Sequence, residues 1–103
     1  MTVAVSRQLV QALLALLARF GIATLDTHLI EDWASASFVG QRHRIRIVLE
    51  TSGRLDMAML AMRLADAEIE LAGHLLADLA LTAHCDTDQG ILLDIEALAL
   101  LDD

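Results

Sequence analysis

The stretch Arg42-His43-Arg44-Ile45-Arg46-Ile47 places an arginine at every second position. A period of two is typical of a strand with one buried face, so the three arginines share one face and His43, Ile45 and Ile47 share the other. The chain has a net charge of −8 and only seven basic residues, all of them arginine. We therefore expect a strand over residues 41–50 that gives one face of a sheet its main positive charge.

Helical and extended patterns alternate along the rest of the chain. Residues 6–20 carry apolar side chains at helical spacing, over an arc wide enough to contact more than one neighbour, with Ser6 as N-cap and Gly21 as a left-handed C-terminal residue. Residues 33–39 predict a strand that forms a hairpin with residues 41–50. A second helix is expected over residues 54–65, and a second hairpin from residues 75–84 and 91–100.

Two segments are harder to interpret. Residues 22–32 have no clear periodicity. Residues 67–83 have the Glu, Leu and Ala content of a helix, which would extend the second helix to residue 83. However, Glu68 and Glu70 alternate with Ile69 and Leu71, and Gly73 interrupts the run. We favour strands in this segment, with a short one around residues 68–71.

These elements predict one domain spanning residues 1–103, of the α+β class. The simplest architecture is a two-layer sandwich, with two helices packed on one face of a mostly antiparallel sheet of four to five strands. The side chains expected on the core face are Ile45, Ile47, Leu49, Ile69, Leu71, Leu79, Leu81, Leu93 and Ile95. Those expected on the opposite, charged face are Arg42, Arg44, Arg46, Glu50, Glu68, Glu70, Asp78, Asp94 and Glu96.

Composition restricts the class of partner. The excess of acidic residues argues against nucleic acid and against anionic membrane surfaces, since both need a basic footprint. The single cysteine, Cys85, has no second cysteine in the sequence to pair with and suits a reducing cytoplasm. The apolar run after Arg7 is too short to span a bilayer and lacks a cleavage site, so a helix is expected there rather than a signal peptide.

Three interpretations of the arginine row stay open. The arginines can pair with carboxylates on neighbouring strands, bind an anionic ligand together with Trp33 and His43, or lie in a subunit interface. The interface gains support because Val48, Leu92, Leu98 and Leu100 fall on the same face. His43 shares its face with core residues, so we expect a neutral, partly buried ring, with proton transfer as the alternative.

Other candidate sites are weak. His74 and Asp78 are four residues apart, and His84 adjoins Cys85, but neither spacing matches a strong metal signature. Nothing in the sequence orients a base toward Cys85 as a nucleophile. Phosphate loops and catalytic serine or zinc motifs are absent from the sequence, so we expect no cofactor and no metal.

The expected function is therefore association. The sequence favours a small bacterial-type cytoplasmic domain that forms a homodimer or contacts another protein, and a non-enzymatic role over an enzymatic one. The alternative is a binding protein or minor enzyme for a small anionic ligand. Its site would involve Trp33, Arg42, His43, Arg44 and Arg46.

Overall fold

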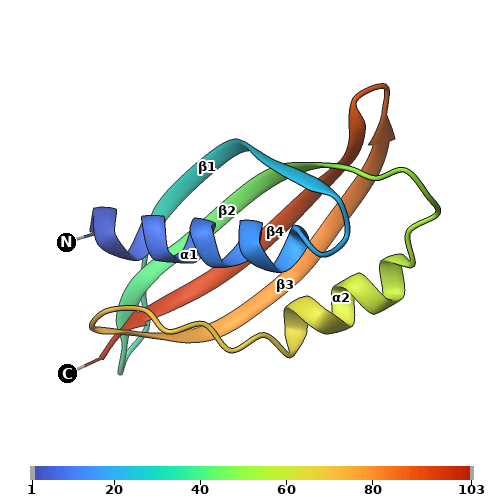
Figure 1. Ribbon diagram of the computed structural model, residues 1–103. Helices are drawn as coiled ribbons and strands as arrows, with labels where there is room; N and C mark the ends of the chain where they lie inside the picture. Colours follow the sequence, from blue (N-terminus) through green and yellow to red (C-terminus); the bar gives the residue numbers. More distant parts are fainter. Residues whose placement is uncertain (1, 103) are drawn as a thin grey trace.

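The computed structural model describes residues 2–102, with side chains from Ala4 onward, and contains two helices and four strands (Figure 1). The elements in chain order are α1 (Thr2–Leu17), β1 (Ile22–Ala34), β2 (Val39–Glu50), α2 (Met57–Ala65), β3 (His74–Thr87) and β4 (Gly90–Leu101). The strands form one antiparallel sheet in the order β1-β2-β4-β3. Both helices pack on one face of this sheet, which confirms the predicted α+β sandwich.

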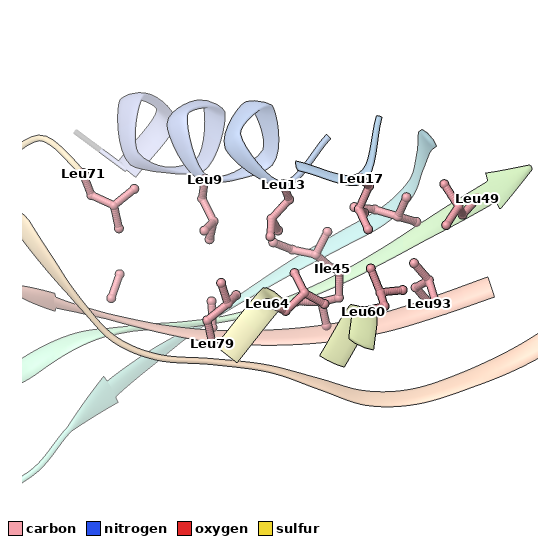
Figure 2. Close-up of a cluster of buried hydrophobic side chains, with 14 of the residues drawn as sticks. Leu9, Leu13, Leu17, Ile45, Leu49, Leu60, Leu64, Leu71, Leu79 and Leu93 are labelled. Carbon is pink, nitrogen blue, oxygen red and sulfur yellow. The ribbon is translucent and has the colours of Figure 1, made fainter. Parts of the chain in front are cut away.

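The core lies between the helices and the sheet (Figure 2). Helix α1 contributes one buried side chain per turn, because its apolar residues recur every four positions: Val5, Leu9, Leu13 and Leu17. Leu60 and Leu64 of α2 are also fully buried. The predicted core residues of β2 and β4 are confirmed, namely Ile45, Ile47, Leu49, Leu93 and Ile95. Leu79 of β3 is buried and Leu81 is half-buried against the same cluster.

The first hairpin differs from its predicted bounds. Strand β1 begins at Ile22, inside the segment that showed no periodicity, while residues 35–38 form the turn. The amide of Ser35 donates to the carbonyl of Phe38 at 2.8 Å. Only Ala23, His28 and Trp33 of β1 are half-buried, and its other residues are exposed. An edge strand that is exposed on both faces has no reason to alternate polar with apolar residues, so its sequence carries no period-two signal.

The strand favoured within residues 67–83 is confirmed from His74 onward, where β3 begins, but residues 67–70 are neither strand nor helix, so the short strand expected there is wrong. Helix α2 ends at Ala65, and Leu71 makes only an isolated bridge to His74. Leu71 is buried and Ile69 is half-buried. The alternation of apolar and acidic residues here therefore arises from a connecting segment that packs its apolar side chains onto the core. Glu68 and Glu70 consequently lie outside the sheet.

The predicted ends of α1 are also wrong. The helix begins at Thr2, so Ser6 lies within its second turn and its buried hydroxyl has no hydrogen-bond partner. Gly21 does not have the positive φ of a left-handed residue, which only Gly73 and Gly90 adopt among the described glycines. Gly21 is required for another reason, since a Cβ there would collide with the backbone carbonyl of Glu50 on β2.

Candidate functional site

The sheet face opposite the helices, which we call the outer sheet face, carries the row of arginines. Strand register places these side chains on it: Ile22, Thr24, Thr27, Leu29, Glu31 and Trp33 of β1; Arg42, Arg44, Arg46 and Val48 of β2; and Leu92, Asp94, Glu96, Leu98 and Leu100 of β4. Because successive residues of a strand point to opposite faces, His43 lies on the helix-covered face instead. The predicted parity of β2 and β4 is therefore correct.

Each arginine of the row faces a carboxylate. Arg46 donates two hydrogen bonds to Asp94, from Nε to Oδ1 at 2.7 Å and from Nη2 to Oδ2 at 3.3 Å, and this pairing raises its pKa. Arg42 donates to Glu96 at 3.2 Å. These two pairs match the predicted pairing between neighbouring strands.

The third pair involves a residue that the sequence did not indicate. Arg44 Nε lies 3.3 Å from Oε1 of Glu31 on β1, and both side chains are more than half exposed. Glu31 belongs to the segment without periodicity, so no sequence signal placed it beside β2. With this pair, all three guanidinium groups of the row already have an acidic partner.

His43 is buried and paired with a second histidine. Its Nδ1 lies 2.8 Å from Nε2 of His28, which comes from the neighbouring strand β1, and its side chain is 0% exposed. The pKa of His43 is lowered to about 4, chiefly by burial and then by the nearby rings of His28 and His74. Burial also lowers the pKa of His28. Both rings are therefore neutral at pH 7, and the arginines on the opposite face are not the cause.

The pair constrains the position of its protons. The buried Nε2 of His43 has no hydrogen-bond partner. If Nδ1–H of His43 donates to Nε2 of His28, then Nε2 of His43 carries only a lone pair and is an acceptor without a partner. The opposite arrangement would leave a buried N–H donor without a partner, which is rarer in proteins. We therefore assign the donor to His43, which leaves the proton of His28 on Nδ1.

Two shallow hollows lie beside the predicted site residues. One of about 450 Å³ is lined by Arg44, Arg46, Asp94 and neighbouring residues. A more apolar one of about 400 Å³ is lined by Trp33, Gly40, His74, Leu101 and others. The predicted site residues therefore fall into three places: the arginine row, the hollow beside Trp33, and the helix-covered face that holds His43.

The weak metal candidates are kept apart by the shape of β3. A bulge between Leu76 and Asp78 changes the facing of the strand, so His74 pairs with Leu101 on one face and Asp78 with Leu98 on the other. His74 Nδ1 lies 3.0 Å from the carbonyl of Ala72. Within residues 2–102, no three His, Cys, Asp or Glu side chains are close enough together to hold a metal ion.

Among residues 4–102, strand β1 carries more exposed large apolar side chains than any other helix or strand. Ile22 is 68% exposed and Leu29 is 61% exposed, both on the outer sheet face. Leu25 and Ile30 point to the helix-covered face, at its margin, and are 38% and 42% exposed. In the part of the chain that the structure describes, β1 pairs only with β2, so the other edge of β1 is open.

Comparison of the chain with protein-family models, with curated proteins and with solved structures gives no match. Among residues 2–102, neither helix has the length and apolar character needed to cross a membrane.

Proposed function

We propose that this chain is a non-enzymatic association module that works as a homodimer, with the edge strand β1 in the contact. The observation that carries the proposal is the accumulation of apolar side chains on a strand whose outer edge is open. Ile22, Leu25, Leu29 and Ile30 are all exposed on β1, on both of its faces. Proteins normally protect an edge strand with charge, proline or a covering element, because its free N–H and C=O groups are a template for another strand.

The same hairpin extends the apolar surface. Phe38 and Val39, at the turn that joins β1 to β2, are 54% and 53% exposed. Exposed aromatic and aliphatic side chains with charged residues among them are a common feature of interaction surfaces. A cytoplasmic location fits this proposal, since the exposed Cys85 would stay a free thiol there.

The anion-binding alternative receives less support. The hollow over the arginine row would let a small anion approach Arg44 and Arg46. However, Arg44 already pairs with Glu31 and Arg46 with Asp94, and the negative charge of these carboxylates weakens the attraction of both guanidinium groups for a second anion.

Native mass spectrometry and sedimentation velocity across a micromolar concentration series test the proposal. We expect a species of twice the 11.2 kDa chain mass that dissociates on dilution and carries no additional mass. A monomer at every concentration would overturn the proposal. A monomer or dimer that carries a co-purified small anion would favour the alternative.

A further inference from the structure

The edge strand β1 contains a regular segment bounded by an irregularity. A bulge interrupts the ladder between Leu25 and Thr27, whereas residues 27–34 pair with β2 without a shift. The segment contains no proline, which would remove an N–H donor from the ladder, and its only charged residues are Glu31 and Asp32. A strand from another molecule can therefore add to this segment in a regular ladder.

We propose that Thr27–Trp33 of β1 pairs antiparallel with the same segment of a second copy, about a two-fold axis that passes midway between the two Ile30 residues. This inference rests on the proposed homodimer and specifies its register. The two sheets would join edge to edge into one sheet of eight strands, because each copy contributes its four. Such an isologous contact uses the same residues on both sides and closes without leaving β1 free for further copies.

The sequence of the segment is complementary to itself only about this centre. A two-fold axis perpendicular to the joined sheet keeps each face on its own side, so every residue lies opposite a residue of the same face. The axis therefore passes midway between one central residue and its own copy. With Ile30 at the centre, the two Ile30 side chains meet, His28 lies opposite Asp32, Leu29 opposite Glu31, and Thr27 opposite Trp33. No carboxylate then faces another carboxylate within these seven residues.

Pairings of the two strands about other central residues are less favourable. A centre at Leu29 places Asp26 opposite Asp32, and centres at Glu31 or Asp32 place that carboxylate opposite its own copy. Like charges directly opposite each other destabilise a sheet. A centre at His28 brings the bulge before Thr27 into the ladder. Charge and backbone regularity therefore select the same centre.

The contact between His28 and Asp32 of the second copy uses the free nitrogen of the histidine pair. His28 Nε2 is occupied by His43 at 2.8 Å, so its Nδ1 is the atom available to a partner. With the proton on Nδ1, His28 has a free donor, and the carboxylate of Asp32 is an acceptor. Two such contacts, related by the axis, would flank the central Ile30 pair.

Disulfide trapping tests the register. The background variant is Cys85→Ser, which removes the one native thiol, and the test variant adds Ile30→Cys. Cβ atoms of directly opposite residues lie about 4.5–5.5 Å apart, which is close to the separation that a disulfide needs. The control adds Ile22→Cys on the same strand, where the side chain is more exposed but falls outside the paired segment.

Under mild oxidation we expect the Ile30→Cys protein to form a covalent dimer at least about tenfold faster than the Ile22→Cys protein, because the dimer raises the effective thiol concentration. Circular dichroism of both reduced proteins checks that the fold is retained. A non-covalent dimer in which Ile30→Cys cross-links no faster than Ile22→Cys would overturn the register and leave the homodimer standing. A monomeric parent protein would overturn both.

Discussion

His28 Nε2 lies 2.8 Å from His43 Nδ1, so the exposed edge strand β1 is hydrogen-bonded to the buried interior of β2. His43 has no solvent exposure, whereas His28 is only half-buried and reaches the margin of the sheet. Protonation of His28 would make both of its ring nitrogens donors. His43 would then have to carry its own proton on the buried, unpartnered Nε2. Protonation of either histidine is therefore unfavourable while the two rings remain hydrogen-bonded.

This resistance to protonation predicts a dependence of stability on pH. The folded pKa of His43, about 4, lies below the value of about 6.5 expected in the unfolded chain. The unfolded state therefore binds more protons between these values, and stability falls as the pH decreases from 6.5 toward 4. We expect His43 alone to lower the free energy of unfolding by about 2 kcal/mol between pH 7 and pH 5. Urea denaturation at the two pH values measures it.

The matched control is His43→Leu, which removes the buried titratable ring and keeps an apolar side chain in its place. Its loss of stability between pH 7 and pH 5 should be clearly smaller than that of the parent protein. An unchanged pH dependence would contradict the assignment of this effect to His43.

A second prediction concerns the centre of α1. Leu13 is fully buried between α1 and the sheet, so Leu13→Ala removes buried methyl groups and leaves a cavity. We expect a loss of about 2–5 kcal/mol in the free energy of unfolding, measured by urea denaturation. Leu16→Ala, on the half-buried side of the same helix, serves as the control and should cost less. Equal losses would contradict the described orientation of the helix.

The buried side of helix α1 and the inner strands β2 and β4 could be predicted from the sequence for the same physical reason. Each of these elements buries one face in the core. Apolar residues therefore recur at the helical period in α1 and at every second position in β2 and β4. That parity placed the arginines of β2 and the carboxylates of β4 on one face, and the structure pairs Arg42 with Glu96 and Arg46 with Asp94. Strand β1 is exposed on both faces and leaves no such pattern. Its contributions, Glu31 beside Arg44 and His28 beside His43, therefore could not be predicted.

The bulges of β3 account for another failure of sequence reasoning. Parity extrapolated from His74 puts Asp78 on the same face, but one extra residue before Asp78 reverses the facing of the strand. A bulge of this kind leaves no composition signal in the residues Leu76, Ala77 and Asp78. The weak metal candidates His74 and Asp78 required a helix to come together, since residues four apart on a strand lie about 13 Å apart even without a bulge.

A third prediction concerns the turn between β3 and β4. Gly90 has φ of 136°, and a Cβ there would lie 2.6 Å from the carbonyl oxygen of Leu49. We expect Gly90→Ala to lower stability by about 1–3 kcal/mol, because the side chain would be strained in that backbone conformation and would also clash. Gly53→Ala is the control, since its Cβ would meet nothing within 4 Å. Thermal denaturation of the two variants should separate them clearly.

A fourth prediction separates ion pairing from anion binding. The pair of Arg44 with Glu31 is largely exposed, so Arg44→Ala should cost less than about 1 kcal/mol. Titration calorimetry with inorganic phosphate should give no difference between the parent protein, Arg44→Ala and a control Arg7→Ala on the exposed side of α1. Phosphate binding that is lost only in Arg44→Ala would revive the anion-binding function.

The last prediction concerns the open edge of β1. Ile30→Lys would place two ammonium groups opposite each other at the proposed axis and would remove the apolar contact between the two copies. Ile30 is 42% exposed, so the fold should tolerate the change, and circular dichroism checks this. We expect the dimer to dissociate at concentrations at which the parent protein is associated, as measured by sedimentation velocity. The control Met62→Lys makes the same kind of change at a side chain of α2 that is 64% exposed, and it should leave association intact. Loss of the dimer in Met62→Lys but not in Ile30→Lys would move the interface from β1 to the helix layer.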